Sequence, residues 1–78
     1  MINCTISSPE KTIEYKDIKS ATLPAYFGKL QILPGHGESF ISLGKGNILL
    51  QQANENVITV PVLGGECHVR NDVVVVVL

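Results

Sequence analysis

Two apolar stretches flank a polar turn in Ile48-Leu49-Leu50-Gln51-Gln52-Ala53-Asn54-Glu55-Asn56-Val57-Ile58-Thr59-Val60-Pro61-Val62-Leu63. The stretches 48–52 and 57–63 have the length of strands. The four residues between them, 53–56, have the composition of a hairpin turn. This segment therefore predicts a β-hairpin and decides the fold class.

The composition of the whole chain favours the same class. Val occurs nine times, Ile eight times and Thr four times among 78 residues, whereas Ala occurs only three times. Branched side chains lose rotamer freedom against a helical turn but fit a pleated surface. No segment shows a 3.6-residue apolar period over ten residues, so we predict an all-β chain.

Further strands are expected on both sides of this hairpin. Residues 2–7 alternate apolar and polar side chains with the period of a half-buried strand. The other predicted strands are 12–15, 18–23, 30–33, 40–43, 66–70 and 73–78, and Pro24 is expected to end the strand 18–23 because it lacks a backbone donor. About nine to ten short strands in one domain, residues 1–78, fit a small antiparallel β-sandwich or a barrel.

The last predicted strand, residues 73–78, is apolar at every position. Its alternate side chains must point to opposite sides of the sheet, so either Val73, Val75 and Val77 or Val74, Val76 and Leu78 line the interior. Three apolar side chains on the outer face of the sheet would be unusual there if that face were exposed to water. We therefore expect a partner, or self-association of the chain, to cover it. The alternative is a central strand shielded by long neighbouring side chains.

Charge and hydropathy argue against several classes of partner. Six Lys+Arg against seven Asp+Glu give a formal net charge of -1, so the chain has no excess of cations to neutralise phosphates. Tyr26 and Phe27 could stack bases, but only Lys29 is near them in sequence. No apolar run approaches the roughly 18 residues of a membrane span. We expect no nucleic-acid partner, no direct membrane insertion and no secretory signal.

Four residues could ligate a soft metal ion, namely Cys4, His36, Cys67 and His68. Cys67 and His68 are neighbours in a predicted strand, so their side chains point to opposite faces and make poor joint ligands. We expect two buried, reduced thiols, two surface imidazoles, and no metal or other cofactor. A catalytic cysteine would need a base within reach, and that alternative stays open at this point.

One segment has a more specific pattern. Gly28-Lys29-Leu30-Gln31-Ile32-Leu33-Pro34-Gly35-His36 is similar to the signature loop of the epsilon subunit of rotary (F-type) ATP synthases. The similarity extends outward in the correct order, and the further segments that carry it are 6–10, 18–24, 43–48 and 64–73. Together they cover nearly the whole chain, which resembles the N-terminal β-sandwich domain of that subunit.

This resemblance implies a flattened sandwich of about ten strands and a subunit without an active site. It implies a rotor subunit of the central stalk that binds the gamma subunit and the c ring and helps to couple proton flow to ATP synthesis. The interface residues that it implies are Lys29, Leu33, Pro34, Gly35 and His36. A bacterial member would lie at the cytoplasmic face of the plasma membrane, attached through the complex.

The chain also departs from the family pattern. Lys29 replaces the usual Glu of the loop, Gln31 replaces a common Gly, and Glu66 stands where an apolar residue is usual. The C-terminal helical hairpin of the family is not expected, so its ATP binding and its inhibition of hydrolysis are not carried over. Lys29 and His36 could instead be solvated loop residues. A stand-alone β-sandwich adaptor and a small nucleic-acid-binding barrel remain as alternative functions.

Overall fold

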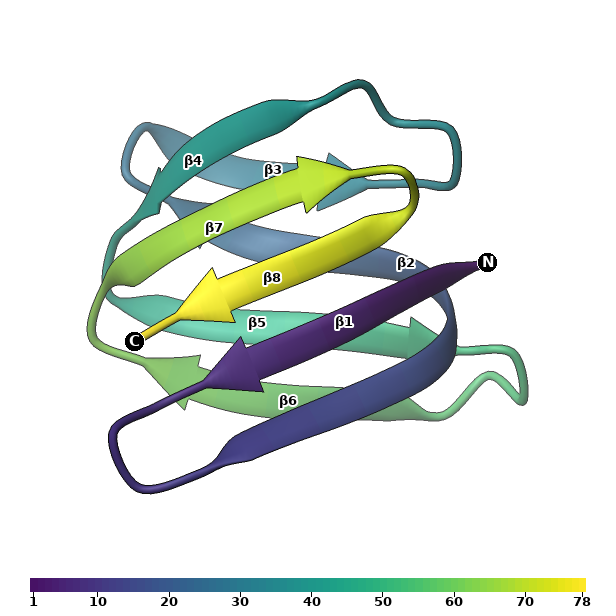
Figure 1. Ribbon diagram of the computed structural model, residues 1–78, viewed down its shortest axis with the longest axis horizontal. Coiled ribbons are helices and arrows are strands. Elements are labelled where there is room, and N and C mark those ends of the chain that lie inside the picture. Colours follow the sequence, from purple (N-terminus) through teal and green to yellow (C-terminus); the bar gives the residue numbers. More distant parts are fainter.

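Eight β-strands and no helix make up the chain (Figure 1). The computed structural model describes all residues, 1–78. The strands are β1 (Ile2–Ser7), β2 (Thr12–Ala25), β3 (Gly28–Ile32), β4 (Ser39–Leu43), β5 (Gly46–Gln52), β6 (Val57–Val62), β7 (Gly65–Arg70) and β8 (Val73–Val77). The prediction of an all-β fold is confirmed. The chain has no helix that is long and apolar enough to span a membrane.

The strands form two layers that pack face to face, as in a β-sandwich. One layer, the front layer of Figure 1, contains β4, β7, β8, β1 and the first half of β2. The back layer contains β3, the second half of β2, β5 and β6. All pairings are antiparallel except that of β1 with β8, which is parallel. The predicted sandwich is confirmed, with this one parallel pair.

The long strand β2 passes from the front layer to the back layer. The sequence predicted two strands here, 12–15 and 18–23, but the chain continues through a bulge at which Asp17 has a φ of 57°. A bulge bends a strand without ending it. The number of strands is therefore eight rather than nine to ten.

The prediction that Pro24 ends its strand is wrong. Pro24 lies within β2, opposite Lys29 of β3. Its carbonyl oxygen accepts a hydrogen bond of 2.8 Å from the backbone N–H of Gly44. In a strand, the backbone nitrogen and the carbonyl oxygen of one residue point to the same side. The nitrogen of Pro24, which carries no hydrogen, therefore faces the junction of β4 and β5, where strand pairing is interrupted. Proline is tolerated at such breaks in a sheet.

A single core lies between the two layers. It contains 17 buried apolar residues, contributed by β1 to β8. Ile2, Ile18, Leu23, Ile48 and Leu50 are completely buried in it. The alternation of buried and exposed positions along β1 and β5 matches the alternation in the sequence. The local pattern of apolar residues in the sequence therefore predicts which residues of these strands form the core.

The apolar strand β8 is a central strand, because it pairs with β1 on one edge and β7 on the other. Val74 and Val76 are fully buried, whereas Val73 and Val77 are 38% and 54% exposed and Val75 is half-buried. Leu78 follows the end of the strand and is exposed. Of the two sets considered from the sequence, the one with Val74 and Val76 therefore lines the interior. Covering of the outward set by a partner or a second copy stays a prediction.

A matched pair of substitutions tests this orientation. We expect Val76→Thr to lower the free energy of unfolding by about 1–3 kcal/mol, because it places a hydroxyl in the apolar core. Val77→Thr should change it by less than about 0.5 kcal/mol, because the side chain already faces water. Urea denaturation of the two variants measures both values. Equal losses of stability in the two variants would contradict the inward orientation of Val76 and the outward orientation of Val77.

Candidate functional site

The loop between β3 and β4, residues 33–38, carries most of the interface residues expected from the sequence. Leu33 is 51% exposed, Pro34 and Gly35 are exposed, and His36 is half-buried. Gly35 has a φ of 82°, a conformation that glycine adopts without steric cost. The backbone N–H of His36 donates to the carbonyl of Leu33 over 3.1 Å and closes a turn. Leu33 to His36 thus lie together on one tight turn.

A carboxylate from the other end of the sequence holds this turn. The backbone N–H of Gly35 donates to Oδ1 of Asp72 over 2.7 Å. Asp72 belongs to the turn between β7 and β8, and it and Asn71 both have positive φ values, 60° and 50°. Two successive residues of positive φ are typical of a tight hairpin turn. Sequence reasoning missed this contact because 37 residues separate its partners.

A second contact fixes the far end of the loop. Nε2 of His68, on β7, lies 2.9 Å from Oε2 of Glu38. The imidazole of His68 also stacks on the ring of Phe40, with ring centroids 4.3 Å apart and an interplanar angle of 5°. Phe40 is 79% exposed on the outer face of the front layer. The loop is therefore fastened to the β7–β8 hairpin at two points, Gly35 and Glu38.

The imidazole of His36 has one nitrogen available to a partner. Its Nδ1 lies 2.8 Å from the carbonyl oxygen of Gly37. A carbonyl oxygen only accepts hydrogen bonds, so Nδ1 carries a proton. In the neutral ring, Nε2 is then an acceptor. His36 can therefore accept a hydrogen bond from a partner, or donate one once it is protonated.

Lys29 lies apart from the loop. It is the second residue of β3, whereas the loop follows the other end of that strand (Figure 1). Its ammonium group takes part in no ion pair of the protein. The structure thus brings Leu33, Pro34, Gly35 and His36 together but places Lys29 at a different part of the surface.

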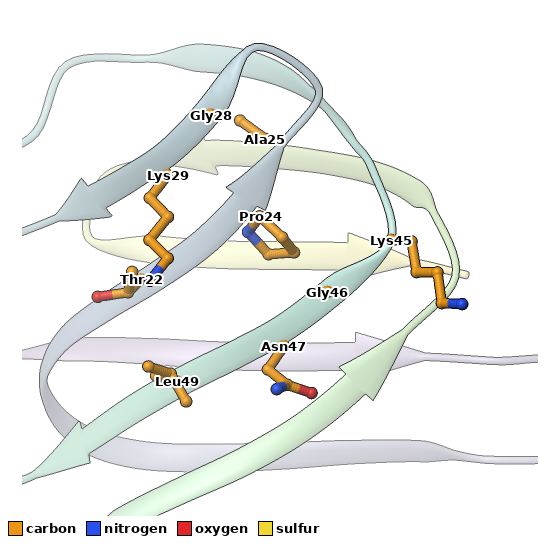
Figure 2. Close-up of a pocket in the computed structure, with 9 residues that line it drawn as sticks. All are labelled: Thr22, Pro24, Ala25, Gly28, Lys29, Lys45, Gly46, Asn47 and Leu49. Carbon is orange, nitrogen blue, oxygen red and sulfur yellow. The ribbon is translucent and has the colours of Figure 1, made fainter.

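Lys29 borders a shallow groove of about 390 Å³ on the outer face of the back layer (Figure 2). The groove crosses β3, β2 and β5, and Lys45, from the turn between β4 and β5, stands at its other end. Its floor includes Pro24 and Leu49. A Cβ atom on Gly46 would lie 2.7 Å from Cβ of Pro24, so only glycine allows β5 to pass this close. The sequence analysis did not identify this groove.

The two cysteines lie in the core. Cys4 and Cys67 are free thiols with exposed fractions of 0% and 2%. Burial raises the pKa of Cys4 to about 12, with a smaller contribution from the nearby Cys67, and raises that of Cys67 to about 11. A thiol is nucleophilic only as the thiolate. Both groups are therefore structural, and the predicted opposite orientation of Cys67 and His68 is confirmed.

The fold and the exposed features together define a small β-sandwich domain, with a hydrogen-bonded loop and a groove on its surface. A family model described as "ATP synthase, Delta/Epsilon chain, beta-sandwich domain" matches residues 1–78. The chain therefore belongs to this family of ATP synthase subunits, which are non-catalytic.

Individual relatives agree with this assignment. The chain is 32% identical over 69 residues to an ATP synthase epsilon chain of Wolinella succinogenes, covering 88% of this chain and 53% of the relative. It is 32% identical over 73 residues to an ATP synthase epsilon chain of Synechococcus elongatus, covering 94% and 53%. The chain thus spans about half the length of these relatives.

Solved structures of low sequence identity share the fold. A chain in the Euglena gracilis mitochondrial ATP synthase (OSCP/F1/c-ring) superposes with a TM-score of 0.89 at 20% identity, covering 97% of this chain and 49% of that one. A chain in the central stalk and c-ring of the Tetrahymena thermophila mitochondrial enzyme superposes with a TM-score of 0.79 at 15% identity, covering 97% and 61%. The sandwich is therefore the fold of chains in ATP synthase assemblies.

Proposed function

We propose that this chain acts as a rotor subunit of the central stalk of an ATP synthase, where it binds the gamma subunit and the c ring. In that position it couples proton flow to ATP synthesis without performing chemistry itself. The observation that carries the proposal is the match of the family model to all residues, 1–78. The match to a chain of the Tetrahymena central stalk and c-ring supports it.

The geometry of the loop 33–38 is suited to this task. A rotor subunit transmits torque, so its contact surfaces have to be rigid. The hydrogen bonds from Gly35 to Asp72 and from His68 to Glu38 fasten the loop to a central hairpin of the front layer. Ordering the loop in advance lowers the entropic cost of binding. We therefore assign Leu33, Pro34, Gly35 and His36 to one contact and Lys29 to a second.

The same proposal places the chain in a membrane-associated complex, at the cytoplasmic face of a bacterial plasma membrane. Its attachment is peripheral, through the gamma subunit and the c ring. The alternative of a stand-alone adaptor unrelated to the synthase is disfavoured by the family match.

Replacing Lys29 and His36 together tests the proposed contacts. We expect Lys29→Ala/His36→Ala to weaken binding to a gamma–c-ring particle at least tenfold, because anchor residues at interfaces cost about 2 kcal/mol or more when truncated. Biolayer interferometry on the immobilised particle measures the change. The melting temperature should stay within about 1 °C, because Lys29 is exposed and His36 lies in a surface loop.

Lys16→Ala is the matched control, because Lys16 is an exposed lysine of the front layer, 3.9 Å from Glu14. Its affinity for the particle should equal that of the wild type. If the double variant also binds like the wild type, Lys29 and His36 do not belong to the interface.

A further inference from the structure

Charge is distributed unevenly between the two layers of the sandwich. The seven acidic residues lie in the front layer or in turns and loops, at Glu10, Glu14, Asp17, Glu38, Glu55, Glu66 and Asp72. The strands that make up the outer face of the back layer carry no outward carboxylate. Glu55, in the turn beside that face, is already paired with Lys19 over 2.6 Å. The outer face of the back layer is thus cationic in a protein whose net charge is -1.

The cations of this face without an ion-pair partner are Lys29 and Lys45, which stand at the two ends of the groove (Figure 2). Neither takes part in an ion pair within the protein. The hydroxyl of Thr22 and the amide of Asn47 supply polar groups along the groove, and Pro24 and Leu49 supply an apolar floor. The groove therefore combines two unpaired positive charges with an apolar surface between them.

The spacing of the two lysines favours an extended ligand over a small ion. Their backbones lie on opposite sides of β2, so they are separated by about two strand spacings, roughly 10 Å. In the structure the two side chains point apart, that of Lys29 toward Thr22 and that of Lys45 away from it (Figure 2), so no single small anion contacts both ammonium groups in this arrangement. In an extended peptide, side chains on the same face recur about every 7 Å. Two carboxylates of such a peptide lie within the reach of two flexible lysine side chains.

We propose that this groove binds an extended acidic segment of a partner protein, with one carboxylate at Lys29, a second at Lys45, and an apolar side chain on Pro24 and Leu49. The proposal rests on the proposed function in one respect, namely that the segment belongs to a rotor subunit. Charge complementarity of this kind sets partner choice and association rate more than raw affinity. Binding is accordingly expected to weaken as salt screens the lysines.

A peptide titration tests the chemistry of the groove without the complex. The probe is acetyl-Glu-Val-Glu-Val-Glu-amide, added to the ¹⁵N-labelled chain and followed by amide chemical shifts at 50 mM and 300 mM salt. We expect saturable shifts at Thr22, Gly46 and Asn47, and at least threefold weaker binding at the higher salt concentration. Lys29→Glu/Lys45→Glu should weaken binding at least tenfold. Lys16→Glu, a charge reversal in the front layer, should leave it unchanged.

A second measurement tests the same variants on the complex. Lys29→Glu/Lys45→Glu should lose at least tenfold in affinity for a gamma–c-ring particle, and Lys16→Glu should bind like the wild type. If the wild type binds the probe peptide but not the particle, the proposed function fails and the groove chemistry stands. Absence of groove shifts with the peptide overturns the present proposal. Equal shifts with inorganic phosphate alone also overturn it, in favour of a small-anion site.

Discussion

Between pH 8 and pH 11 the free energy of unfolding of this protein should fall by several kcal/mol. The cause is the burial of Cys4 and Cys67, whose thiols have pKa values of about 12 and about 11 in the folded chain, compared with an ordinary value of 9.0. Above pH 9 the unfolded chain loses both thiol protons while the folded chain keeps them. Stability is therefore fully present below pH 9 and is lost as the pH rises toward the folded pKa values.

The slope of the loss can be estimated. Each thiol that ionises only in the unfolded state lowers stability by about 1.4 kcal/mol per pH unit. Two thiols therefore give nearly 3 kcal/mol per pH unit, which is large for a chain of this size. Urea denaturation at pH 8, 9, 10 and 11 measures the slope. Cys4→Ala/Cys67→Ala is the control, because it keeps the lysines and tyrosines of the wild type and lacks only the two thiols. The prediction fails if this variant shows the same slope as the wild type.

Gly65→Ala should be the most destabilising single substitution outside the core. Gly65 begins β7 with a φ of 137°, which L-residues with a side chain rarely adopt. A Cβ atom there would lie 2.7 Å from the carbonyl oxygen of Val77 and 3.0 Å from Cδ2 of Leu78. The first contact is with backbone, so the strands β7 and β8 would have to separate. Backbone strain and overpacking together should lower the free energy of unfolding by about 3–5 kcal/mol.

Gly37→Ala provides the matched control for Gly65→Ala. Gly37 does not have a positive φ, and no atom lies within 4 Å of a Cβ placed there. We expect its free energy of unfolding to change by less than about 0.5 kcal/mol. Thermal denaturation, followed by circular dichroism, compares the two variants. Similar melting temperatures for both would mean that β7 and β8 are not packed as described.

The positions of the strands could be predicted from the sequence because they depend on local pattern. Ile2, Cys4 and Ile6 alternate with polar residues and point into the core, as their spacing predicts. The continuity of β2 could not be predicted in this way. Thr12 to Ala25 is held together by pairing with β1, β3 and β5, so a break in the local pattern at Asp17 does not end the strand.

The candidate site could be predicted only in part. The turn from Leu33 to His36 follows from contiguous residues, so the sequence located it. Asp72, which holds the turn, lies in the hairpin turn between β7 and β8, and His68, which holds Glu38, lies on β7. Each is at least 30 residues away from its partner, and nothing in the local pattern links them to the loop. Nothing in the local sequence pattern links Lys45 to Lys29. Its position opposite Lys29 depends on the close approach of Gly46 to Pro24.

Capture of the rotor by this chain tests the central claim most directly. The full chain, with an affinity tag at its N-terminus, is expressed in the organism that encodes it and is purified from gently solubilised membranes. The account predicts that the gamma subunit and the c ring copurify with it, with one copy of the chain for each gamma subunit. Capture of the tagged chain without gamma or the c ring, while intact synthase particles that lack this chain stay in the unbound fraction, would contradict the account.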